Sequence, residues 1–248
     1  MLHVALAVGA GLVATAFCFA TTERWLANRR RHELAWSGAL AFFAIASFAL
    51  AAGAGLGWNE ASFKVFFLFG AIVNVPYLAL GTVYLLAGER AGDRAAVVVT
   101  VLVTFAAGVV VASPLKGALP ADELVQGKDI FGVLPRVFAA SCSGVGALVV
   151  FGGAALSAWR YRQGRMLWAN ALIALGTAML SGSGLLNSVL GEMDAFAVTL
   201  AAGVTVIFAG FLVASTRTGT SRPVLRAMPA ALDEEASRPS RAAAHPRR

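Results

Sequence analysis

Residues 63–87 read FKVFFLFGAIVNVPYLALGTVYLLA, and the interpretation of the whole chain starts from them. The stretch is long and apolar enough to cross a lipid bilayer, which takes about 20 such residues. Its middle nevertheless contains an amide, a proline and a tyrosine, at Asn74, Pro76 and Tyr77. No other apolar segment of the sequence has a proline near its centre. We predict that this stretch is the third of seven transmembrane helices and the one most directly concerned with function.

The composition is typical of helical membrane proteins that cross the bilayer several times. The chain has 248 residues, of which 58% are hydrophobic and 13% charged, whereas about 25% of the residues in soluble domains are charged. The apolar residues form blocks of about 18–25, as transmembrane helices require. They do not alternate with polar residues in segments of about ten, which is the pattern of a membrane β-barrel.

Seven such blocks predict an all-α transmembrane domain over residues 1–215. The predicted helices span approximately residues 3–20, 34–56, 63–87, 95–112, 137–159, 166–190 and 195–215. Residues 216–248 contain four prolines and seven arginines against three acids, without apolar periodicity. We predict that they form a disordered basic tail, which could contact anionic lipid heads or a separate cytoplasmic partner.

The net charge of +7 is explained by membrane insertion rather than by nucleic-acid binding. Arginines crowd the loops on one side of the predicted helices: Arg29, Arg30, Arg31, Arg90 and Arg94 are examples. Loops rich in arginine and lysine stay in the cytoplasm. The sequence therefore predicts a membrane protein with its N-terminus outside and its C-terminal tail inside.

A weak internal repeat relates the second predicted helix to the sixth at a shift of 132 residues. Arg30 then aligns with Arg162, and Trp36 with Trp168, without a gap. The first three and the last three helices would form parallel halves joined by the fourth, a 3+1+3 arrangement that often places a ligand between the halves. Basic and aromatic residues also recur at membrane boundaries without any duplication, and this explains the same matches.

Small and aromatic residues indicate how the helices pack. The fifth predicted helix has four glycines that suit close packing against a neighbour: Gly144, Gly146, Gly152 and Gly153. Trp36 and Trp58 lie at the two ends of the second predicted helix, as in the aromatic belts of membrane proteins. Cys18 and Cys142 lie at different predicted depths, so we expect packing residues and no disulfide.

The predicted helices carry no charged residue and no histidine in their middle. Such residues mark proton relays, ion-coupled pathways and voltage sensors, so pumps and ion-coupled transporters are disfavoured. Retinal proteins are excluded, because residues 195–215 contain no lysine for a Schiff base. No cluster of histidines or acids could hold a metal or serve as a base. We expect no metal, no cofactor and no catalytic residue.

The remaining candidates for a ligand site are neutral: Asn74, Pro76, Tyr77, Tyr84 and Asn187. The first four belong to the third predicted helix, and Asn74 is nearest to the middle of the membrane. Pro76 should free the carbonyl group of Ile72 and bend the helix, which either opens a pocket or merely fits the bundle. An interhelical hydrogen bond and core packing explain the same residues without any ligand.

The chain resembles uncharacterised seven-helix membrane proteins of bacteria, most clearly over residues 66–85. The resemblance rests on Leu68-Phe69-Gly70-Ala71, on Asn74-Val75-Pro76 and on the arginine-rich loop before Leu34-Ala35-Trp36. It covers residues 1–215. The resemblance implies the seven-helix architecture in a bacterial plasma membrane and no particular activity.

Three functions are compatible with these observations. The first is non-catalytic: binding or sensing of a small neutral or lipid ligand, or organisation of partners. The second is facilitated passage of a small neutral solute through a 3+1+3 bundle. The third, an intramembrane enzyme, is the least favoured, because no serine in the predicted helices has a base in view.

Overall fold

A computed structural model of the chain describes residues 2–116, 119, 127–160, 164–190 and 193–215. This part is helical apart from short connections, which confirms the all-α class. Residues 1–215 form one unit by their contacts. The predicted tail, residues 216–248, lies outside the described residues.

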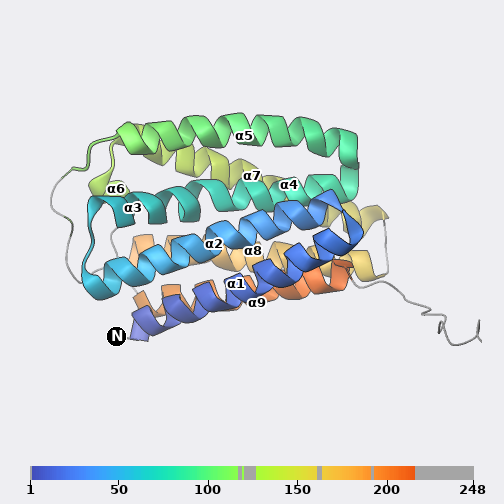
Figure 1. Cartoon of the computed structure of the whole chain (residues 1–248), viewed down its shortest axis with the longest axis horizontal. Coiled ribbons are helices and arrows are strands. Elements are labelled where there is room, and N and C mark those ends of the chain that lie inside the picture. The colour runs from blue at the N-terminus through green and yellow to red at the C-terminus, as the bar shows by residue number, and fades with distance from the viewer. Residues whose placement is uncertain (1, 117–118, 120–126, 161–163, 191–192, 216–248) are drawn as a thin grey trace, which may run out of the picture. The chain divides into compact units, whose positions relative to one another are not determined.

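The described chain forms seven long helical segments and one short helix (Figure 1). In chain order they are α1 (Leu2–Asn28), α2 (Arg31–Leu56), the continuous run of α3 (Glu60–Phe67), η1 (Leu68–Val73) and α4 (Asn74–Ala87), then α5 (Glu89–Ala112), the short α6 (Gly127–Ile130), α7 (Val133–Arg160), α8 (Arg165–Leu190) and α9 (Met193–Ser215). The helix predicted for residues 63–87 is therefore the run from α3 to α4.

Five of these segments are long and apolar enough to cross a membrane. They are Val4–Asn28, Arg31–Leu56, Glu60–Ala87, Glu89–Ala112 and Val133–Ser157. In the described part of α8 and α9, the apolar stretches are the shorter Arg165–Leu180 and Val198–Ala214. The chain thus has the helices of a multi-pass membrane protein, five of them of full spanning length.

Several helices extend beyond the apolar blocks that predicted them. The helix predicted to end near residue 20 continues to Asn28, and the next begins at Arg31 instead of near residue 34. The helix predicted from residue 95 begins at Glu89. A helix satisfies its own backbone hydrogen bonds, so it can continue into water beyond the apolar stretch. As a result, Glu33 lies inside a helix rather than in a loop.

Two helix pairs dominate the packing: α1 with α2, and α8 with α9. Further contacts join α2 to α4, α4 to α7 and α1 to α9. One core, around Trp36, Phe43, Leu78 and Phe211, is shared by α2, α4 and α9. By contrast, α5 contacts mainly α4, and its large side chains such as Val101 and Phe105 are exposed. Such an apolar outer face suits contact with lipid.

The basic end of the bundle comprises the last turns of α1 and α4 and the first turns of α2 and α5. Arg31 of α2 forms an ion pair with Asp93 of α5 there. At the opposite end an aromatic core joins α3 to the segment that follows α6. Phe131 packs between Phe63 and Phe67, with ring centroids 5.3 and 4.8 Å away. Trp58 belongs to the same core.

The glycine surface predicted for the fifth helix is half confirmed. A β-carbon at Gly146 of α7 would lie 3.1 Å from the carbonyl oxygen of Val75, and one at Gly153 would lie 2.5 Å from the Thr82 methyl group. Both glycines therefore let α7 approach α4. Gly144 and Gly152 would meet nothing within 4 Å, so this prediction is wrong for them.

A closer glycine contact, between α8 and α9, was not predicted. A β-carbon at Gly176 would lie 2.6 Å from the carbonyl oxygen of Gly203. One at Gly210 would lie 2.8 Å from the carbonyl oxygen of Ala169. The two backbones lie in contact without intervening side chains, which accounts for the extensive packing of this pair.

The aromatic-belt prediction is wrong for both tryptophans. Trp36 is 0% exposed and stacks on Phe211 of α9 at 4.4 Å, and Trp58 is buried as well. The exposed tryptophans are Trp159 and Trp168. Because Trp36 is buried and its aligned counterpart Trp168 is exposed, this pair gives no support to the internal repeat.

The two cysteines are free, as predicted. Cys142 is buried, and Cys18 is half-buried with its sulfur 3.7 Å from the hydroxyl oxygen of Ser37.

Candidate functional site

The helix that carries Asn74 changes its hydrogen-bond register immediately before this residue. Residues Leu68–Val73 form a π-helix, η1, and the backbone N–H of Asn74 donates to the carbonyl group of Phe69, five residues back. Pro76 follows two residues later and has no N–H to donate, so an α-helical ladder is interrupted here in any case. Single π-helical turns inside α-helices are frequent at functional sites. The structure thus has a change of hydrogen-bond register just before Pro76, and the predicted bend of the helix stays a prediction.

Helix α7 supports the π-helical turn from one side. The hydroxyl group of Ser143 donates a hydrogen bond of 2.6 Å to the carbonyl oxygen of Ala71. One turn further along α7, Gly146 brings the two backbones together at Val75. The Ser143 hydroxyl group thereby donates to a backbone carbonyl group in the stretch where Pro76 has no backbone N–H to donate.

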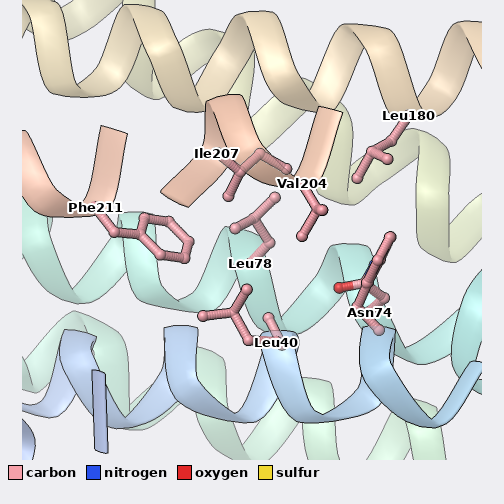
Figure 2. A pocket seen from close by; sticks show the side chains of 9 residues that line it. Leu40, Asn74, Leu78, Leu180, Val204, Ile207 and Phe211 are labelled. Carbon is pink, nitrogen blue, oxygen red and sulfur yellow. The ribbon is translucent and has the colours of Figure 1, made fainter. Parts of the chain in front are cut away.

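A small cavity lies on another side of the same turn, between α2, α4, α8 and α9 (Figure 2). Asn74 is its polar residue, and the others are apolar: Ala39, Leu40, Phe43, Leu78, Leu180, Val204, Ile207 and Phe211. Its volume is about 10 Å³, which is the lower limit for one water molecule. The cavity therefore holds one small group in the conformation described.

No hydrogen bond joins the side-chain amide of Asn74 to another described residue, although its polar atoms are not fully covered as those of Glu33 and Trp36 are. Asn74 is 8% exposed, and its amide oxygen is turned toward Leu78 in Figure 2. A side-chain amide offers two donors and one acceptor oxygen. Leaving such a group unpaired in an apolar site costs about 1–3 kcal/mol. An apolar cavity of this size beside one amide is suited to a single small polar group, such as the hydroxyl or carbonyl group of an otherwise apolar molecule.

Pro76 and Tyr77 do not line this cavity. Pro76 is buried in the helix. Tyr77 packs edge-on against Phe42 of α2, with ring centroids 4.9 Å apart, and contacts the helix at Gly38. The four candidates of the third predicted helix are thus not brought together around one space.

Tyr84 belongs to the basic end, ten residues along the helix from Asn74, or about 15 Å. Its hydroxyl group donates a hydrogen bond of 2.9 Å to Asp93, which is also the ion-pair partner of Arg31. Its ring covers Gly92 of α5, where a β-carbon would overlap it. Tyr84 therefore connects α4 to α5 and α2, and its position is explained without a ligand.

Helix α8 contains two asparagines, Asn170 and the candidate Asn187. The side chain of Asn187 lies outside the described part of the chain, so its assignment to the site stays a prediction. Asn170 is buried and donates hydrogen bonds to the Ser157 hydroxyl at 3.1 Å and to the Met166 carbonyl at 3.0 Å. It fixes α8 against α7 and has no free donor directed at the cavity.

Most of the cavity wall was not anticipated from the sequence. Val204, Ile207 and Phe211 are spaced as neighbours on one face of α9, which is the only local signal they carry. An apolar residue in a uniformly apolar helix gives no indication of whether it faces lipid, a neighbouring helix or a cavity. These residues form a cavity wall only because α9 packs near α2 and α4.

Within the described residues there is no group of three or more histidines, cysteines or acids that could hold a metal. Comparisons with protein-family models, with curated proteins and with solved structures find no match to this chain. The chain is thus a helical protein with five long apolar helices, and its function is argued from the site alone.

Proposed function

We propose that this protein spans the membrane seven times and binds a small neutral or lipid ligand at the Asn74 cavity. The single observation that carries the proposal is Asn74, an 8% exposed residue whose amide makes no hydrogen bond within the described residues, in an otherwise apolar space. Five full-length apolar helices and two shorter ones support the seven spans. A ligand with one carbonyl or hydroxyl group on an apolar body would pair the amide, and the lining side chains would move apart to admit the apolar body, because the present volume takes one small group.

We infer binding without catalysis from the residues around the cavity. Its lining has no acid, base or nucleophile beside the amide of Asn74, and acid–base or covalent catalysis needs such groups. Passage of a polar solute needs polar groups along a route, and the lining gives this alternative no support. We therefore place binding or sensing before facilitation, and enzymatic activity last.

The orientation of the protein is part of the same proposal. Arg24, Arg29, Arg30 and Arg31 lie at the basic end with Arg90, and this asymmetry favours a cytoplasmic location for that end. The N-terminus would lie outside and the basic tail inside a bacterial plasma membrane. A separate cytoplasmic partner at the tail remains a proposal that rests on the tail's charge alone.

The experiment compares short-chain n-alcohols with alkanes of the same length, added to the purified protein in detergent. A ligand that binds only the folded state raises the melting temperature. We expect the alcohols to raise it more than the alkanes, because only the alcohols pair the amide. In Asn74→Leu this difference should vanish. Tyr77→Phe, on the same helix but outside the cavity, should keep it.

Equal effects of alcohols and alkanes on the wild-type protein would overturn Asn74 as the ligand-binding group. An alcohol effect that persists unchanged in Asn74→Leu would do the same. Flux of a small neutral solute into liposomes, abolished by Asn74→Leu, would replace binding by facilitated passage.

A further inference from the structure

Glu33 is a buried acid without a partner at the basic end. It is 1% exposed, and its Oε2 atom has no hydrogen-bond partner within the described structure. Trp36 Nε1 is the other such atom, but it faces Gly81 of α4 and concerns a different contact. A buried carboxyl oxygen without a partner is costly in its charged and neutral forms alike. The described chain does not supply a donor, so a partner from outside would stabilise the site.

The hydroxyl groups nearest along α2 are already engaged. Ser37, one turn after Glu33, lies 2.6 Å from the Thr22 hydroxyl of α1. Thr22 in turn donates to the carbonyl oxygen of Cys18 at 2.7 Å. These groups hold α1 against α2, and neither is recorded as a donor to the carboxyl group.

The charges that act on Glu33 are those of Arg30 and Arg24. Neither arginine forms an ion pair within the described residues, whereas Arg31 is held by Asp93. The site thus combines one unpaired carboxyl group with two unpaired guanidinium groups. A bare cation would be repelled by the arginines, and an anion by the acid. A ligand that carries both charges satisfies the three groups together.

An apolar stripe on α1 leads to this end. Leu12, Phe19 and Leu26 are 58%, 70% and 52% exposed and are spaced by seven residues, so they follow one face of the helix. In a membrane such a face lies along acyl chains. The turn between α1 and α2, where Arg29 adopts a φ of 55°, then lies at the level of the lipid headgroups.

We propose that Glu33, Arg24 and Arg30 bind the headgroup of an aminophospholipid. The primary ammonium group donates hydrogen bonds to Glu33, and the two guanidinium groups hold the phosphodiester, for which their planar donors are suited. The acyl chains run along Leu26 and Phe19. Because Glu33 is 1% exposed in the conformation described, the proposal requires a local opening at this end of the bundle when the headgroup binds. The proposal is independent of the Asn74 site and requires only that the helices lie in a membrane.

Native mass spectrometry of the full chain tests the proposal with three lipids that have identical acyl chains. Phosphatidylethanolamine has N–H donors, phosphatidylcholine has the same charges without N–H donors, and phosphatidylglycerol has only the negative charge. We expect phosphatidylethanolamine to be retained about tenfold or more over phosphatidylcholine, the value of a hydrogen bond to a charged group. This comparison needs no variant of the protein.

Two matched variants assign the preference to its residue. Glu33→Gln should lose the preference for phosphatidylethanolamine, whereas Glu23→Gln, an exposed acid on α1, should keep it. Melting temperatures of both variants show that they are folded. Replacing Arg24 and Arg30 together by glutamine should weaken retention of phosphatidylethanolamine and phosphatidylglycerol.

Four results would overturn the proposal. Equal retention of phosphatidylethanolamine and phosphatidylcholine would show that no group accepts the N–H donors. A preference that is unchanged in Glu33→Gln would remove Glu33 from the site. Strongest retention of phosphatidylglycerol would show that the arginines bind the lipid phosphate without a contribution from Glu33. Displacement of the lipid by equimolar phosphorylethanolamine would show a soluble ligand in place of a lipid.

Discussion

The hydroxyl group of Ser143 in α7 donates a 2.6 Å hydrogen bond to the carbonyl oxygen of Ala71 in η1. It connects the π-helical turn before Asn74 to a helix more than seventy residues later in the chain. The geometry of the candidate site therefore depends on a neighbouring helix as well as on Pro76.

Ser143→Ala should lower the free energy of unfolding by about 1 kcal/mol, within the range measured for side-chain hydrogen bonds between membrane helices. Ser141→Ala is the matched control, because Ser141 is exposed on the same helix. Unfolding in mixed micelles measures both values. Equal effects of the two substitutions would show that the bond to Ala71 contributes nothing.

Gly81→Ala should destabilise the protein by about 1–3 kcal/mol through overpacking. A β-carbon at this position would overlap the indole ring of Trp36, which is itself fixed by stacking on Phe211. Gly9→Ala should instead be neutral or stabilising, since nothing lies within 4 Å and alanine favours a helix. Thermal unfolding of both variants in one detergent measures the contrast. A stable Gly81→Ala protein would contradict the packing described.

Gly146→Ala should reduce stability more than Gly144→Ala. A β-carbon at Gly146 would press on the backbone of Val75, whereas one at Gly144 would meet open space. The backbone cannot yield as a flexible side chain does, so we expect a loss of about 1–3 kcal/mol. The same unfolding measurement applies. A larger loss in Gly144→Ala would place the contact surface of α7 elsewhere.

Tyr84→Phe should cost about 0.5–1.5 kcal/mol, because it removes the hydrogen bond to Asp93. Tyr77→Phe is the control, since that ring packs on Phe42 and its hydroxyl has no recorded bond. The ion pair between Arg31 and Asp93 is half exposed and contributes little by itself. We expect the Tyr84 effect to change only slightly with salt. A strong salt dependence would show that the ion pair contributes more to the free energy of unfolding than the hydrogen bond does.

Asn74→Leu should raise the stability of the ligand-free protein by about 1–3 kcal/mol. The substitution replaces an unpaired amide with an apolar group of similar size in an apolar cavity. Gain of stability with loss of ligand binding is the pattern expected where function requires a destabilising residue. Chemical unfolding without added ligand measures it. Marked destabilisation would show that the amide is paired in the native bundle.

The sequence by itself determined the membrane character and the sites of irregularity. Block-like apolar residues predict spanning helices because the hydrocarbon thickness fixes their length. The helix around Asn74 and Pro76 is predictable for a local reason, since proline lacks a donor whatever surrounds it. The π-helical form of this irregularity was not predictable, because the Ser143 hydroxyl group that bonds to the turn comes from another helix.

Only the tertiary structure decided which residues meet. It separated Tyr84 from Asn74, buried Trp36 against α9, and placed Val204 and Ile207 across from Asn74. In helices that are apolar on all sides, periodicity does not distinguish a face toward lipid from a face toward protein. The tertiary structure also placed Glu33 inside a helix, because helices continue past their apolar stretches. Whether its carboxyl group finds a hydrogen-bond donor depends on the neighbouring helices, and Oε2 has none in the described structure.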